Sequence, residues 1–168
     1  MSATAERTDV FAGYSDEERP LAGYAALIAT FGLGFAGFLL ALARSEKDFP
    51  QRVRFDDLLL TAVATQKLSR TIAKDKVTGA LRAPFTRYQG SAGPGEVDEA
   101  PRGHGLRRAL GELFSCPFCV SQWVAAGFSY GLVLWPRPTR FVAGLMTATA
   151  LADALQLAYK ALEEHATS

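Results

Sequence analysis

The sequence predicts an all-α integral membrane protein with about three transmembrane helices and one interfacial or cytoplasmic amphipathic helix. Residues 21–43 and 113–135 contain no charged residue, and 141–159 contains one, Asp153. About 20 helical residues cross a bilayer core of about 30 Å, so each run is long enough to span it. Helices of soluble proteins rarely lack a polar face over such a length.

The N-terminal tail, residues 1–20, is expected to precede a retained transmembrane helix. Its five acidic residues against two arginines argue against a secretory signal peptide, which begins with a positive region. Within 21–43, Gly32, Gly34 and Gly37 formally match a dinucleotide-binding fingerprint. That fingerprint requires a preceding strand, so we expect these glycines to allow close packing of helices instead.

The region 44–112 is strongly basic, because residues 44–108 hold 13 of the 18 lysines and arginines. A helix is predicted over 55–74, opened by Asp56 or Asp57, and the basic residues in its second half suit a membrane surface. The alternatives are a cytosolic helix packed on its neighbours and a fourth, kinked membrane span. Residues 87–105 are rich in glycine and proline and are predicted to be a mobile linker without strands.

Basic loops stay on the cytoplasmic side of membranes. We therefore expect a multi-pass membrane protein, with its N-terminus outside and 44–112 in the cytoplasm. The segment 113–160 should form a transmembrane hairpin (113–135 and 141–159), with an outer turn at 136–140 and the tail 161–168 inside.

Asp153 is a carboxylate within a predicted transmembrane helix, where an ionised group is costly and usually functional or paired. We expect it to face the interior of the helix bundle. A structural hydrogen bond is favoured, and the alternative is a proton or ion relay in an oligomeric channel or transporter. Its local candidate partners are Thr147, Thr149 and Gln156.

The two cysteines of the chain, Cys116 and Cys119, flank a Pro-Phe pair at an expected helix start. Three interpretations remain open: a structural role, thiol redox chemistry, and metal ligation. Thiols in a first helical turn are activated by the helix dipole. A Cys-x-x-Cys pair supplies two of the four ligands of zinc, so a metal would have to be shared across an oligomer.

Two stretches, "DKVTGALRAPF" (75–85) and "CPFCVSQWVA" (116–125), together resemble the bacterial membrane-protein family called domain of unknown function 1360 (DUF1360). The resemblance covers roughly residues 55–160 and implies a small integral membrane protein with no assigned reaction. With the expected topology, it places the chain in a bacterial inner membrane. The positions that match its pattern are Arg70, Asp75, Thr78, Leu81, Arg82, Pro84, Phe85, Cys116, Cys119 and Trp123.

In this motif, Asp75 is expected to pair with Arg70 or Arg82. Because proline disfavours helix at the residue before it, residues 80–85 should form an extended or interfacial strap. Arg82 would then bind lipid phosphates or Asp75. A further hypothesis places Asp75 and Arg82 in one cluster with the two cysteines.

The sequence favours a non-enzymatic membrane anchor or assembly component. Its expected partners are the lipid bilayer and a second copy or another membrane protein. A net charge of +1 argues against a nucleic-acid partner. No cofactor is expected, apart from the zinc that an oligomer could share through Cys116 and Cys119.

Overall fold

The computed structural model describes residues 10, 11 and 13–167. The first nine residues of the predicted acidic tail lie outside this description. The described residues are mostly helical but include a two-stranded sheet, so the prediction of an all-α chain needs correction. The elements are α1 (Leu21–Ala43), α2 (Phe55–Lys74), the 3-10 turn η1 (Lys76–Thr78), α3 (Gly79–Arg82), β1 (Thr86–Gly93), β2 (Glu96–Pro101), α4 (Gly105–Ser115), α5 (Pro117–Leu134) and α6 (Pro136–Thr167).

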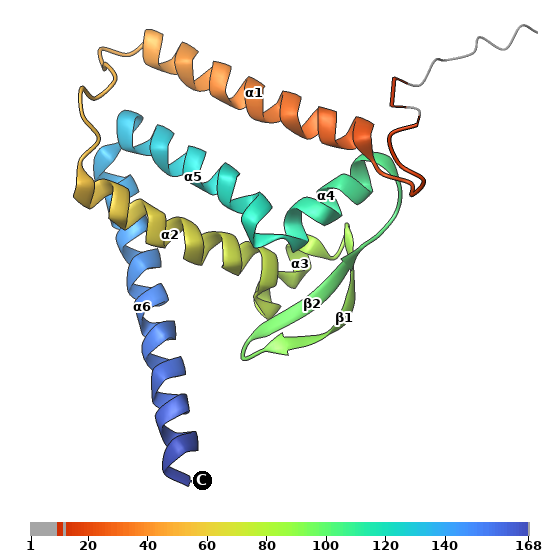
Figure 1. Ribbon diagram of the computed structural model, residues 1–168. Coiled ribbons are helices and arrows are strands. Elements are labelled where there is room, and N and C mark those ends of the chain that lie inside the picture. Colours follow the sequence, from red (N-terminus) through yellow and green to blue (C-terminus); the bar gives the residue numbers. More distant parts are fainter. Residues whose placement is uncertain (1–9, 12, 168) are drawn as a thin grey trace, which may run out of the picture.

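The helices α1 and α5 run beside each other in the same direction (Figure 1). The ring of Phe31 meets Trp123 edge-on with centroids 5.2 Å apart, and the ring of Phe38 stacks on Tyr130 at 4.4 Å. Seven residues along α1 thus correspond to seven along α5, as in parallel helices. If both helices span a membrane, the expected placement of 44–112 on one side would require them to be antiparallel.

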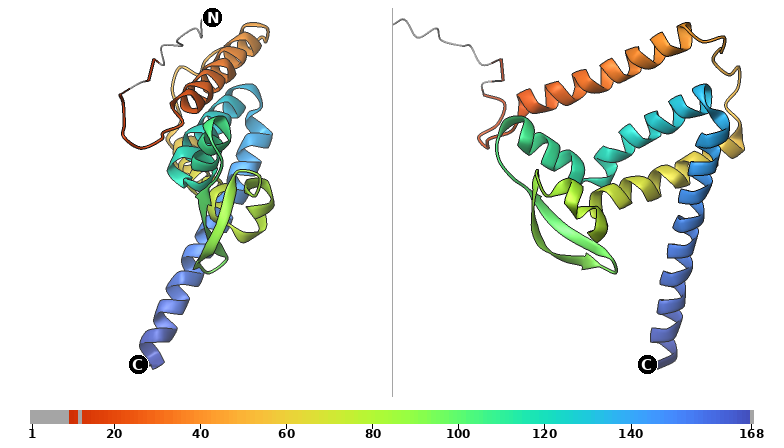
Figure 2. Two further views of the ribbon diagram at one scale, coloured as in Figure 1. Left: turned by 90° about the vertical axis from the view of Figure 1, so that its right-hand side faces the viewer. Right: turned by 180° about the vertical axis from the view of Figure 1, so that it is seen from behind.

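The helix α2 lies between α5 and α6 and runs opposite to α5 (Figures 1 and 2). It confirms the helix predicted over 55–74. Ala64 of α2, Phe128 of α5 and Ala143 of α6 form the buried centre of this contact. Two small side chains there allow the helices to approach closely, and the surrounding apolar side chains are Leu60, Leu68, Val124 and Met146.

The helix α6 differs from the predicted hairpin in its start and its direction. It begins at Pro136, so the expected turn at 136–140 is helical and Trp135 alone joins it to α5. Proline is tolerated at the first helical position, where no intrahelical donor is needed. Figure 1 shows α6 diverging from α5, crossing α2 and projecting beyond the body of the protein. Its residues 151–166 are exposed.

The predicted mobile linker is instead an antiparallel hairpin, in which Thr86 pairs with Pro101 and Ser91 with Val97. Its turn contains Gly93 and Gly95, whose φ angles of 145° and 75° favour glycine. Few apolar residues alternate along these strands, which is why the sequence pattern did not indicate them. Side-chain contacts with α2 and α3, described below, hold the hairpin in place.

The expected packing role of Gly32, Gly34 and Gly37 is not found among residues 10, 11 and 13–167, because a Cβ added at any of them would meet nothing there within 4 Å. The close approach is at Gly23 instead. A Cβ there would lie 2.7 Å from the Cβ of Ala109, so Gly23 lets the start of α1 touch α4.

Among the described residues, three helices are long and apolar enough to cross a membrane: Leu21–Ala43, Pro117–Leu134 and Pro136–Ala166. Only 11%, 17% and 6% of their most apolar windows are buried within the chain. Their apolar surfaces therefore remain available to lipid or to other helices.

Candidate functional site: a buried arginine network and the Cys-x-x-Cys helix start

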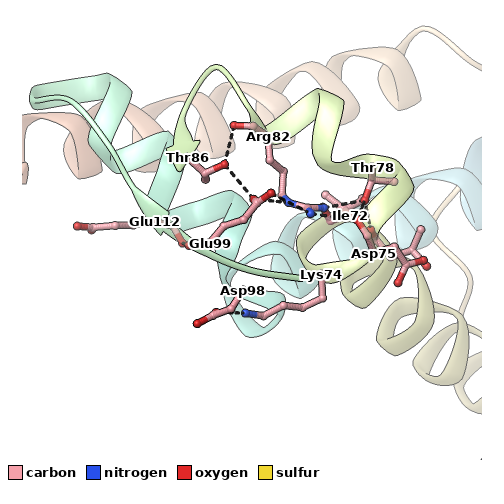
Figure 3. A network of polar contacts seen from close by, with 11 residues as sticks. Ile72, Lys74, Asp75, Thr78, Arg82, Thr86, Asp98, Glu99 and Glu112 are labelled. Carbon is pink, nitrogen blue, oxygen red and sulfur yellow. Dashed lines mark hydrogen bonds and ion pairs between the residues drawn. The ribbon is translucent and has the colours of Figure 1, made fainter. Parts of the chain in front are cut away.

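Arg82 is the centre of a polar network that joins α2, α3 and the hairpin (Figure 3). Its side chain is completely buried, although it ends the short helix α3. The Nε atom donates to Glu99 at 2.8 Å, and Nη1 donates to the Ile72 carbonyl and to Thr78 Oγ1, both at 2.7 Å. Nη2 donates to the Asp75 carbonyl at 3.0 Å and faces the second Glu99 oxygen at 3.4 Å.

Two threonine hydroxyls complete the network. Thr86 Oγ1 lies 2.9 Å from Glu99 Oε2 and 3.0 Å from the Arg82 carbonyl, so it donates to one of these acceptors. Thr78 Oγ1 donates to the carbonyl of Thr71 or Asp75 while accepting from Arg82. No buried side-chain nitrogen or oxygen in the described part of the chain lacks a partner. The network is therefore internally satisfied and leaves no donor of Arg82 for a ligand.

The acidic partners differ from those expected. Arg70 pairs with Glu96 through contacts of 2.6 and 2.8 Å, and Arg82 pairs with Glu99. Asp75 contributes its backbone carbonyl to Arg82 rather than its carboxylate. The two glutamates lie in the hairpin, and a third hairpin residue accepts from α2 through the pair Lys74–Asp98 at 3.3 Å.

The expected extended strap is a helical turn, Gly79–Arg82, followed by a tight turn into β1. This conformation directs Arg82 inward, which corrects the expectation that it binds lipid phosphates. The carbonyl of Pro84 accepts from Arg107 at 2.8 Å, and the Phe85 ring lies 5.7 Å from that of Phe114. These contacts fix the turn to α4, whereas Leu81 is exposed. We call α3, β1, β2 and α4 together the cap.

The cysteines mark the break between α4 and α5. Cys116 is the N-cap of α5, and its Sγ accepts from the Cys119 amide at 3.2 Å, with Pro117 at the first helical position as predicted. Both thiols are free, and Cys119 is exposed. Cys119 also lines an apolar groove of about 350 Å³ between α1 and α5, with Phe31 and Trp123.

The hypothesis of a cluster of Asp75 and Arg82 with the cysteines gains no support from the described contacts. Neither residue forms a hydrogen bond or ion pair with Cys116 or Cys119 there. Within the same residues, no three His, Cys, Asp or Glu side chains gather as a metal site. A metal held by the two thiols would therefore need further ligands from outside the described residues.

Asp153 is half exposed and pairs with Lys67 of α2 at 2.8 Å. It does not use the expected local partners, since Thr147 donates to the Leu60 carbonyl and Thr149 to its own helix. A second pair between these helices was not predicted: Arg140 donates twice to the Asp57 carboxylate, each time at 2.7 Å. The sequence places Arg140 in the turn at 136–140, so the charge opposite to that of Asp57 was the only available signal.

A family model described as a protein of unknown function (DUF1360) matches residues 59–159. The match includes most of α2, the whole cap, the Cys-x-x-Cys helix start and most of α6, and it leaves α1 outside. No curated protein and no solved structure matches the chain. Because the matched segment is more than half of the chain and contains the arginine network, this protein is a member of the DUF1360 family.

Proposed function

We propose that this chain is a multi-pass protein of a bacterial inner membrane that acts as an anchor or assembly component, presenting the cap at one membrane face. One observation carries the proposal. Three helices could each span a bilayer, and only a small share of their most apolar windows is buried within the chain. Large exposed apolar surfaces mark membrane or protein contacts. The lipid bilayer and a second copy or another membrane protein are the partners that fit them.

The buried arginine network supports a structural rather than a catalytic role for the family motif. A catalytic group must reach substrate, whereas all donors of Arg82 are used by acceptors in β2 and in the segment 72–78. The pair of Asp153 with Lys67 likewise gives the carboxylate a fixed partner, so a channel or relay is not favoured.

The membrane placement is tested by alkaline extraction of membranes from cells that express the full chain. We expect the protein to stay in the pelleted membranes and to dissolve only in detergent, because apolar spans are held by burial of their surface in lipid. A variant with Leu33→Lys, Phe35→Lys and Leu39→Lys in α1 should be retained less well. Release of the unchanged protein into the alkaline supernatant would contradict the proposal.

Thiol chemistry is the second candidate function, favoured by the exposure of Cys119 beside the Cys116 sulfur. On the leading proposal we expect both thiols to react with a maleimide without reductant, and Cys119 to react first because it is more exposed. Cys116→Ser and Cys119→Ser identify which thiol is labelled. Blocked thiols freed by a reductant would favour redox chemistry, and thiols freed by a chelator would favour a metal such as zinc shared between copies.

A further inference from the structure

The parallel packing of α1 and α5 constrains the path of the chain across a membrane. A chain that crosses twice in the same direction must cross back between the two spans. At the start of α1, the Tyr24 hydroxyl donates to Glu112 of α4. Glu112 lies three residues before the end of α4, and α5 begins two residues after that end. At the other end, Lys47 in the loop after α1 donates to the carbonyl of Leu134, the last residue of α5. The two helices therefore end at one level, and the start of α1 lies beside α4, which leads into α5.

Only α2 can make the return within residues 44–116. At 20 residues it is about 30 Å long, whereas the 11 residues of α4 reach about 16 Å. Its first turn lies at the end of α5, where Asp57 binds Arg140. Its last turn lies at the cap, where Lys74 binds Asp98. Figure 2 shows α2 and α5 side by side over this length.

The charged residues of α2 lower its mean hydropathy below that expected of a membrane span. Each of these charged residues nevertheless forms an ion pair. Asp56 and Asp57 bind Arg54 and Arg140 at one end, and Arg70 and Lys74 bind Glu96 and Asp98 at the other. Between them, residues 58–66 are uncharged. Charged residues within membranes pair with one another or snorkel to the surface. Lys67, the deepest charge, has Asp153 of α6 as its partner, and the five pairs are Arg54–Asp56, Arg140–Asp57, Lys67–Asp153, Arg70–Glu96 and Lys74–Asp98.

We infer that α2 is a fourth membrane-crossing segment, packed against α5 and α6 along one side and neutralised by ion pairs. This rests on the proposed membrane placement. The N-terminal tail, the cap and the end of α6 then share one face. The loop 44–54 and the corner at Trp135 lie on the opposite face. This arrangement replaces the topology predicted from basic residues, in which the tail and the cap face opposite sides.

Single cysteines in a Cys116→Ser, Cys119→Ser background test the inference on sealed vesicles of both orientations, with a membrane-impermeant maleimide. The four positions are exposed: Ser15, Glu46, Ala92 and Arg137, each changed to cysteine. We expect Ser15→Cys and Ala92→Cys to react from one side, and Glu46→Cys and Arg137→Cys from the other. If the maleimide labelled Ser15→Cys and Arg137→Cys from one side, and Glu46→Cys and Ala92→Cys from the other, the inference would be overturned. Membrane insertion itself would then still stand. Labelling of all four from both sides would overturn both proposals.

A second measurement uses the Lys67–Asp153 pair without introducing cysteines. At depth in the membrane, Asp153→Leu leaves a lysine unpaired, so the ratio of folded to unfolded protein should fall tenfold or more. Lys67→Leu combined with Asp153→Leu removes both charges and should restore most of that ratio. Lys160→Gln, which breaks the exposed pair with Glu164, is the control and should change the ratio less than twofold. Equal, small effects of Asp153→Leu and of the double variant would indicate that α2 faces water.

Discussion

Replacing Arg82 with glutamine is expected to lower the free energy of unfolding of the detergent-solubilised chain by about 3–5 kcal/mol. The guanidinium is completely buried and the side chain of its partner Glu99 is 8% exposed. Loss of the cation leaves the Glu99 carboxylate in a buried site without its counter-charge, and leaves the carbonyls of Ile72 and Asp75 without a donor. Unfolding by SDS in mixed micelles, followed by fluorescence of the two tryptophans, measures the change.

Two further variants separate the buried pair from general effects of charge. Arg87→Gln removes an exposed arginine of the same hairpin and should stay within about 0.5 kcal/mol of the unchanged protein. Arg82→Met with Glu99→Leu removes both charges and should be less damaging than Arg82→Gln, because no buried charge is left unpaired. An effect of Arg82→Gln as small as that of Arg87→Gln would contradict the structural role of the network.

The long apolar helices were predictable because their positions depend on local composition. The run 21–43 coincides with α1, and 141–159 lies within α6. The run 113–135 is divided at Cys116 between the last turn of α4 and the whole of α5. Hydropathy carries no information on direction, however, so the parallel arrangement of α1 and α5 could not be predicted. The start of α6 was also missed, since the prolines at 136 and 138 indicate a turn as readily as a first helical turn.

The candidate site was predictable in its residues but not in its contacts. Arg70, Thr78 and Arg82 were selected by the family resemblance, and all three take part in ion pairs or hydrogen bonds of the cap. Their acidic partners, Glu96 and Glu99, were assigned to a mobile linker, because each lies 17–26 residues from its arginine and the strands lack an alternating apolar pattern. A hairpin stabilised by charges contributed by other elements gives no local signal.

Gly111→Ala is expected to destabilise the protein by about 1–3 kcal/mol, although alanine ordinarily stabilises a helix by about 0.5–1 kcal/mol relative to glycine. Gly111 is buried in α4, where a Cβ would lie 2.5 Å from the Phe85 carbonyl oxygen and 3.1 Å from the Cα of Pro101. Both neighbours are backbone atoms of the cap, so the new methyl group can fit only if α4 moves away from the turn that follows Arg82.

The sign of the effect is the decisive observation, and Gly127 of α5 supplies the matched control. A Cβ at Gly127 would meet nothing within 4 Å, so Gly127→Ala should leave stability unchanged or raise it through helix propensity. Gly111→Val should cost more than Gly111→Ala, because its branched side chain needs a larger shift of α4. SDS unfolding of the three variants under identical conditions measures the difference. If Gly111→Ala stabilised the chain as Gly127→Ala does, α4 would not press against the Phe85–Pro101 backbone, and this close contact would not be part of what holds the cap.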